Sequence, residues 1–191
     1  MMKAQTSVEI HEVLANRRSP RSLDPSAVLS HQDLLAILEA ARWAPSANNG
    51  QPWRFFIGNR GDETFAQILD SLASFNQGWA HRSSVLILVA GVNSREDGTP
   101  NKNFMYDCGL AVAQLVFETH DRGYVAHQMT GFDSAKMIAN LGIASSLTPV
   151  AVISIGTQAP AEQLQGAMLE RENAPRERKA FTEIVLKGLP D

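Results

Sequence analysis

The sequence predicts an α/β (α+β) fold in which a central mixed sheet is layered with helices. Helical and strand-like apolar patterns alternate along the 191 residues, as expected for a sheet covered by helices. The segment 84–92, SVLILVAGV, is apolar almost throughout and rich in β-branched residues, which is typical of a central strand buried on both faces. With 44% hydrophobic residues, the chain is long enough for one core and short for two, so we expect a single domain over residues 1–191.

Two helices are expected near the start of the chain. Thr6 and Glu9 have the spacing of a capping box, and apolar residues at helical spacing follow as far as Arg17. Ser30 is a favourable N-cap for a second helix, which Pro45 must end. The next elements are a polar loop over 45–52, a short strand over 53–57 and a helix over 64–75.

The second half continues the alternation. Residues 93–103 have the Gly, Pro, Asn and charged composition of a mobile surface loop and form the candidate lid. Residues 104–122 form a long helix that is apolar on several sides, so it is either central or at a subunit interface. The remaining elements are strands over 124–129 and 150–155, a helix capped by Asp133 and ended by Gly142, and a charged C-terminal arm from about residue 160 with a brief apolar stretch at 181–186.

Composition excludes several classes of function. A net charge of −3, with 19% charged residues, gives no overall positive field for nucleic acid or an anionic membrane. The N-terminal segment lacks the apolar core of a signal peptide, and no apolar run approaches the roughly 20 residues that span a bilayer. We therefore expect a soluble protein of the cytoplasm that binds neither nucleic acid nor membrane.

Common catalytic signatures are also missing from the sequence. It contains no phosphate-loop GxxxxGK, no GxGxxG, no nucleophile elbow and no HExxH. The five histidines show no ligand spacing, so no metal site is expected. Cys108 is the single cysteine, which excludes an internal disulfide, and its apolar surroundings in the sequence indicate a small core residue.

Two segments carry candidate binding chemistry. Residues 17–21, RRSPR, offer three guanidinium groups and a hydroxyl, which suit a phosphate or the carbonyl edge of a heterocycle. Cations at a helix C-terminus that simply face solvent would explain the same run. Residues 43–53 place amides, a hydroxyl, prolines and a glycine between two tryptophans, a composition that fits a flat, polar-edged ring better than a bare turn.

Three blocks in order resemble the FMN-binding nitroreductase family, and together they span most of the chain. The blocks are RRSPRSL at 17–23, AARWAPSANNGQPWRF at 40–55 and GFDSAKMIANLGI at 131–143. The resemblance implies a nitroreductase-like fold, a domain-entwined homodimer and FMN sites at the subunit interface. It departs from the family at Ala47, where a second Ser is common, at Asn48, where Thr is common, and at Thr130, where Glu is common.

The resemblance also implies the cofactor-binding residues. Arg17, Arg18 and Ser19 would hold the FMN phosphate and ribityl chain, and Arg21 would reach the pyrimidine edge. The backbone near Thr130 and Gly131 would face flavin N5, so no side chain is expected to act as catalytic acid or base. The remaining candidates are, from the second block across the dimer, Pro45, Ser46, Ala47, Asn49 and Gln51, and, from other segments, Asn76, Arg176 and Arg178. A solvated charged arm is the alternative for the last two.

The implied function is an FMN-dependent oxidoreductase. In a ping-pong cycle, NADH or NADPH would deliver hydride to FMN, and a nitroaromatic, quinone or activated alkene would then accept it. Two alternatives remain: an offshoot that uses reduced FMN for desaturation or dehalogenation, and a non-enzymatic flavin-binding protein. The sequence identifies neither the physiological acceptor nor the preferred nicotinamide.

Overall fold

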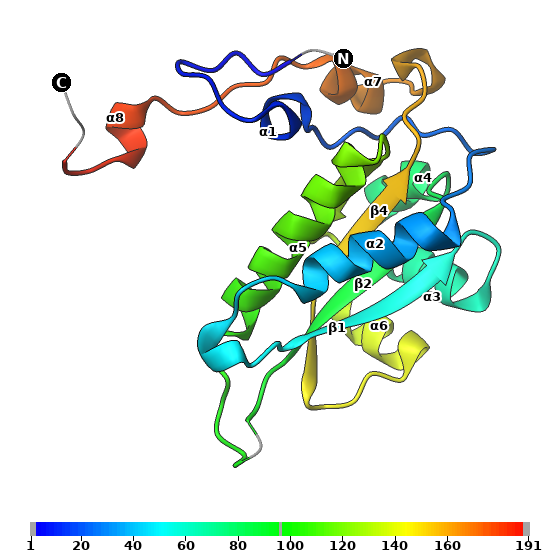
Figure 1. Cartoon of the computed structure of the whole chain (residues 1–191). Coiled ribbons are helices and arrows are strands. Elements are labelled where there is room, and N and C mark those ends of the chain that lie inside the picture. Colours follow the sequence, from blue (N-terminus) through cyan, green and yellow to red (C-terminus); the bar gives the residue numbers. More distant parts are fainter. Residues whose placement is uncertain (1–2, 96, 189–191) are drawn as a thin grey trace.

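The computed structural model describes residues 3–95 and 97–188. A four-stranded sheet in the order β1-β2-β4-β3 lies at its centre, and helices cover both faces of it (Figure 1). The strands are β1 (Trp53–Asn59), β2 (Val85–Val92), β3 (Val125–Met129) and β4 (Leu147–Gly156). The helices are α1 (Glu12–Asn16), α2 (His31–Arg42), η1 (Ala47–Asn49), α3 (Glu63–Ser71), α4 (Ser74–Ala80), α5 (Phe104–Asp121), α6 (Ser134–Leu141), η2 (Ala161–Gln163), α7 (Ala167–Asn173) and α8 (Phe181–Ile184).

The sheet layered with helices is confirmed, but the described sheet is antiparallel, not mixed as expected. The three pairings between its described strands are all antiparallel. The chain leaves β1, passes through α3 and α4, and returns to the same end of the sheet, where Arg60 N donates to Ser84 O at 3.0 Å. The returning strand β2 must therefore run opposite to β1.

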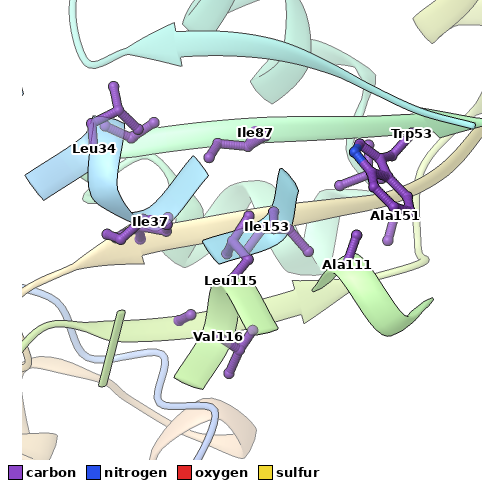
Figure 2. Close-up of a cluster of buried hydrophobic side chains, with 14 of the residues drawn as sticks. Leu34, Ile37, Trp53, Ile87, Ala111, Leu115, Val116, Ala151 and Ile153 are labelled. Atoms are coloured by element: carbon purple, nitrogen blue, oxygen red, sulfur yellow. The ribbon is translucent and has the colours of Figure 1, made fainter. Parts of the chain in front are cut away.

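Strand β2 is buried on both faces, as the sequence predicts. Ile87 and Val89 point into a core formed with α2 and α5, part of which Figure 2 shows. Leu86 and Leu88 point into a second core formed with α3, α4 and α6. Two helical layers therefore enclose the sheet, and β1 and β3 form its edges.

Several predicted helix ends are confirmed. Ser30 Oγ accepts a hydrogen bond from Asp33 N at 3.0 Å and caps α2. Asp133 caps α6 in the same way, and Gly142 ends that helix in the left-handed conformation, with φ 61°. Helix α5 covers the predicted 104–122 segment almost in full.

The first helix is shorter than the sequence predicts. It begins at Glu12 with His11 as its N-cap, so the capping box expected from Thr6 and Glu9 does not form. The preceding segment folds back along the helix instead, and Ala4 N donates to Ala15 O at 2.9 Å. Its apolar residues Val8 and Ile10 remain exposed, so no burial supports a longer helix.

The helix expected over 64–75 is divided in two. It ends at Ser71, and α4 begins at Ser74. Leu72 adopts an extended conformation and forms a bridge with Phe132, which draws the backbone out of the helix. The break places Phe75 and Asn76 in a separate short helix beside the segment that follows β3.

The charged arm after residue 160 contains helices that the sequence pattern does not predict. Leu23 and Gln158 form a bridge just beyond β4, which holds the arm next to the segment that follows α1. The chain then forms η2 and α7, and the stretch to α8 runs away from the sheet beside the N-terminal segment (Figure 1). The arm and the residues around 15–24 therefore lie together at one end of the molecule.

The packing of α3 on β1 makes a testable stability prediction. A Cβ added at Gly58 would lie 2.4 Å from Phe65 N, which is helix backbone, whereas a Cβ at Gly78 would meet only the flexible end of Met168. We expect Gly58→Ala to lower the free energy of unfolding by about 1–3 kcal/mol. Gly78→Ala, in a helix interior, should lower it much less or raise it. Chemical denaturation of both variants measures the difference, and equal effects would contradict this account of the packing.

Candidate functional site

The segment that follows α1 places its polar groups against the edge strand β3. Arg17 donates to Ser19 Oγ at 3.3 Å, and Ser19 Oγ donates to Gln128 Oε1 at 3.4 Å. Gln128 lies on β3, two residues before Thr130. These contacts bring the first predicted block, at one edge of the sheet, to the strand that leads into the third block.

The C-terminal arm adds two more arginines to this edge. Arg176 donates to Ala15 O at 2.8 Å and to Arg17 O at 2.6 Å. Burial lowers the pKa of Arg17, and the charges of Arg176 and Arg178 lower it further. The site therefore concentrates positive charge where an anion would relieve the repulsion.

One buried carboxylate from α7 lies among these cations. The side chain of Glu172 is 2% exposed, and its Oε2 accepts from Arg21 N at 2.8 Å. Its Oε1 pairs with the Arg18 guanidinium at 3.7 Å, and Arg18 also donates to the backbone carbonyl of Glu172. Arg18 is therefore engaged by the arm.

Arg21 faces an aromatic ring from α4. Its guanidinium lies 5.8 Å from the centre of the Phe75 ring, and the Arg171 guanidinium lies 4.7 Å from the same ring. Burial lowers the pKa of Arg21, although the charge of Glu172 opposes that shift. Within the described residues, the buried Nε of Arg21 has no hydrogen-bond partner, so it is a donor directed at nothing in the chain.

Asn76 lies beside the backbone that follows β3. Its side-chain amide donates to Gly131 O at 3.0 Å, and a Cβ at Gly131 would lie 3.0 Å from the same amide nitrogen. Ala73 N also donates to Gly131 O, at 3.0 Å. Thr130 and Gly131 themselves are exposed. The half-buried Asn76 and the exposed Thr130 and Gly131 therefore form one wall next to Phe75.

The second predicted block is not part of this cluster. The loop 45–52 lies at the start of α5, where Ala47 N contacts both carboxylate oxygens of the buried Asp107 at 3.3 Å. Arg17 and Arg18 instead interact with His120, near the other end of α5. Given the 1.5 Å rise per helical residue, about 20 Å of helix separates the two locations, and Figure 1 shows them at opposite ends of α5.

The loop 45–52 has a well-defined internal structure. Ser46 Oγ accepts from Gln51 N at 3.0 Å, and the Gln51 side chain donates to Asn49 O at 3.0 Å. Asn48, Asn49 and Gln51 have positive φ values, which are uncommon for residues other than glycine. The loop is thus held in a strained conformation. In this conformation it exposes the polar groups of residues 46–51, which lie between Pro45 and Pro52.

Two histidines border the arginine segment and are held neutral. Burial lowers the pKa of His127 to about 4, and the Arg21 charge contributes, while the Pro20 carbonyl at 3.1 Å from Nδ1 opposes the shift. Burial and the Arg17 charge lower the pKa of His120 to about 4. The His127 ring also packs against Trp79, with ring centres 4.6 Å apart.

Several residues at this edge and beside the loop 45–52 have no recognisable signal in the sequence. Glu172 and Arg171 belong to a stretch that reads as a solvated charged arm, and Phe75 reads as the end of a longer helix. Gln128 stands in a strand pattern, and its contact with Ser19 depends on pairing between distant segments. Asp107 lies in an apolar helix, and only its burial identifies it as a partner of the loop.

In residues 3–95 and 97–188, no three His, Cys, Asp or Glu side chains converge as metal ligands would. No helix in the same ranges is both long enough and apolar enough to cross a bilayer. Cys108 is buried in the core, as the sequence predicts, and burial raises the pKa of its thiol to about 11.

Comparison with known proteins agrees with this arrangement. Residues 14–77 match the model of the Nitroreductase family, and they include both the arginine segment 17–21 and the polar loop 45–52. A crystal structure of an oxidoreductase containing FMN superposes with a TM-score of 0.91, at 32% identity, over 97% of this chain and 95% of that one. The chain belongs to the nitroreductase family.

Other nitroreductase-family relatives have more specific names. The "Putative NAD(P)H nitroreductase YdgI" of Bacillus subtilis is 28% identical over 187 residues, which cover 78% of this chain and 88% of the relative. The CLA biosynthesis enone reductase of Lactiplantibacillus plantarum is 26% identical over 188 residues, which cover 79% of this chain and 86% of the relative.

The neutral state of His127 leads to a pH prediction for this nitroreductase-family protein. Its folded pKa of about 4 lies below the unfolded value of about 6.5, so the unfolded chain binds a proton between these values that the folded chain does not. The free energy of unfolding should therefore fall as the pH falls from about 6.5 to about 4.

The variant His127→Asn, which keeps a donor for the Pro20 carbonyl, should weaken this dependence by up to about 1.4 kcal/mol per pH unit. Guanidinium denaturation at pH 7.5 and pH 5 measures it, with the exposed His31→Asn as control. An unchanged pH dependence in His127→Asn would contradict the assignment.

Proposed function

We propose that this chain binds FMN and uses it as an NAD(P)H-dependent oxidoreductase. The observation that carries the proposal is the convergence, at one sheet edge, of Arg17, Ser19 and the arm arginines with the Arg21, Asn76 and Gly131 wall. A phosphate suits the first group, and a flat ring with polar edges suits the second. The FMN of the 32% identical solved oxidoreductase has both parts.

The residues present fit FMN chemically. Beyond the effect of burial, the charges of Arg176 and Arg178 lower the pKa of Arg17, and the charge of Arg178 also lowers that of Arg176. The cluster therefore favours an anion of high charge, such as a phosphate monoester. The unpartnered buried Nε of Arg21 is a donor available to a carbonyl of the ring. Gly131 leaves no side chain on the wall, so a ring can approach its backbone closely.

FMN would supply the redox chemistry, taking hydride from a nicotinamide and giving it to the acceptor. The protein's contribution is positional and electrostatic. Arg21 provides positive charge at the edge of the ring where negative charge develops on reduction. The backbone N–H groups near Thr130 and Gly131 are proposed as donors to the ring. The low pKa values of His120 and His127 keep both imidazoles neutral, and no side chain of the cluster is proposed to transfer a proton.

The complete site is proposed to need two copies of the chain. The loop 45–52 lies about 20 Å of helix away from the arginine segment of its own chain. It would instead line the FMN of a second subunit through Pro45, Ser46, Ala47, Asn49 and Gln51. In such a homodimer each subunit would contribute to both sites.

Exposed apolar side chains on α2 and α5 support this homodimer. They lie on the same helical layer that carries the loop 45–52, and a surface of this kind is uncommon on a monomer. The exposed residues are Leu35, Trp43, Met105, Tyr106 and Phe117. A groove of about 420 Å³, lined in part by Leu14, Val13 and Phe117, lies between α1, α2 and α5. Burial of this layer against a second copy would cover all of these groups.

The proposed acceptors are small oxidised molecules such as nitroaromatics, quinones or activated alkenes. The names of the two curated relatives give an NAD(P)H donor for one and an enone reductase activity for the other. The described site holds no acid or base that would limit it to one acceptor, so stacking on the ring would decide what binds.

The direct test is a spectrum of the purified protein followed by release of its chromophore with acid. We expect FMN near one per chain, and rapid loss of its absorbance on anaerobic mixing with NADH or NADPH. The faster donor identifies the physiological nicotinamide. Turnover of a simple nitroaromatic then completes the test.

Other outcomes would contradict the proposal in different ways. A colourless protein that takes up no FMN would refute the cofactor assignment. A yellow protein that neither nicotinamide reduces would point to the flavin-binding alternative. Reduction without turnover of any nitroaromatic, quinone or enone would point to the desaturation or dehalogenation alternative.

The homodimer has a separate test. Phe117→Glu places a charge on the exposed layer of α5, whereas Ala66→Glu places one on the exposed side of α3, in the opposite layer. We expect Phe117→Glu to shift the mass measured by light scattering towards the monomer and to lower FMN content, because desolvating the charge at an interface is unfavourable. Ala66→Glu should change neither. A Phe117→Glu variant that remains dimeric would show that this layer is not the interface.

A further inference from the structure

Glu172 is unusual among the acidic residues of the charged arm. Its carboxylate is 2% exposed, and among the described residues it forms an ion pair with Arg18, at 3.7 Å. The neighbouring acidic residue Glu170, on the same short helix, is exposed. A buried carboxylate without a basic partner would be strongly destabilising, so the position of Arg18 matters for the arm.

The contacts of Glu172 determine how the segment 17–21 is held. Oε2 accepts from the backbone N–H of Arg21, and Oε1 and the backbone carbonyl engage the guanidinium of Arg18. The Arg18 side chain is only 16% exposed as a result. Arg18 thus points into the arm, although the sequence assigns it to the phosphate.

The arginines of the cluster therefore divide into two roles. Arg18 binds Glu172, and the Arg176 guanidinium donates to the backbone carbonyls of Ala15 and Arg17. Both sets of contacts join the arm to the segment that follows α1. Arg17 instead contacts Ser19, and the Arg178 guanidinium donates to the adjacent carbonyl of Glu177 at 2.6 Å.

We propose that Glu172 is a positioning residue of the phosphate-binding site. It joins α7 to the segment 17–21 through Arg18 and the backbone of Arg21, so that Arg17, Ser19 and Arg178 converge on the FMN phosphate. Arg18 then acts through Glu172 and does not contact the phosphate itself. This inference rests on the proposed binding of FMN.

The test compares FMN with riboflavin, which lacks the phosphate. Apoprotein is prepared from the full chain, and dissociation constants of both flavins are measured by fluorescence quenching. Glu172→Ala should weaken FMN binding by about tenfold or more, because it removes the acceptor of Arg21 N and leaves the buried Arg18 guanidinium without its carboxylate partner. Riboflavin binding should change less than about threefold. Glu170→Ala, on the exposed side of α7, is the matched control and should change neither.

Two further variants separate positioning from general stability. Glu172→Gln keeps an acceptor for Arg21 N but loses the charge that pairs with Arg18, so its FMN affinity should lie between those of the native protein and Glu172→Ala. Arg18→Ala should also weaken FMN binding. The double variant Arg18→Ala with Glu172→Ala should bind FMN no more weakly than Glu172→Ala alone, because both substitutions remove one interaction.

Each remaining outcome overturns a defined part of the argument. Equal losses of FMN and riboflavin affinity would reduce Glu172 to a stability role, and additive losses in the double variant would return Arg18 to direct phosphate contact. Unchanged FMN affinity in Glu172→Ala would refute the inference outright. A native protein that binds neither flavin would instead refute the proposed function, so the two failures are distinguishable.

Discussion

Strand β2 is apolar on both faces, and this constraint organises the rest of the molecule. Because Leu86 and Leu88 face one side and Ile87 and Val89 the other, helices must cover the sheet twice. The middle positions of the sheet are then taken by β2 and β4, and β3 is left at an edge. At that edge, the backbone and polar side chains of β3 can contact other segments. The segment after α1 and the C-terminal arm both meet there.

The electrostatics of this edge follow from bringing two basic segments together. Arg17, Arg176 and Arg178 lie close enough for their charges to lower the pKa of Arg17. Backbone carbonyls offset part of this repulsion, since Arg176 donates to Ala15 O and Arg17 O. The buried carboxylate of Glu172 pairs instead with Arg18, and its charge opposes the lowering of the Arg21 pKa. Some unrelieved positive charge remains, and that is what a site for a dianionic phosphate requires.

Much of the fold could be predicted from local patterns. Ser30 and Asp133 could be predicted as helix caps because a side-chain cap depends on a few neighbouring residues. Strand β2 could be predicted as a central strand because its almost entirely apolar composition indicates burial on both faces. The divided helix at Leu72 could not be predicted, because the bridge to Phe132 joins residues 60 positions apart and overrides local helix propensity. Thr6 and Glu9 failed as a cap for the opposite reason: their pattern is local, but no core supports it.

The candidate site shows the same division. Arg17 and Ser19 could be named from the resemblance, and the structure places them with Asn76, Thr130 and Gly131 at one edge; their roles toward FMN remain predictions. Arg18 has the same residue type as Arg17 and directly follows it, yet its guanidinium points into the arm. Only the position of Glu172, 154 residues further along, separates the two.

The arm is therefore the part of the site whose structure is hardest to predict from the sequence. A run such as RENAPRERK carries no periodicity, so nothing local tells a solvated residue from a buried one. Burial there is decided by the partner segment: Glu172 is enclosed because Arg18 and Arg21 N require an acceptor, while Glu170, two residues earlier, has no such demand on it. Apolar packing also holds the arm, because Leu164 is buried in the second core and Met168 and Leu169 pack against it. The polar contacts of Glu172 instead fix how the arm meets the segment 17–21. A change of one charge at this junction should therefore affect phosphate recognition more than it affects the stability of the sheet.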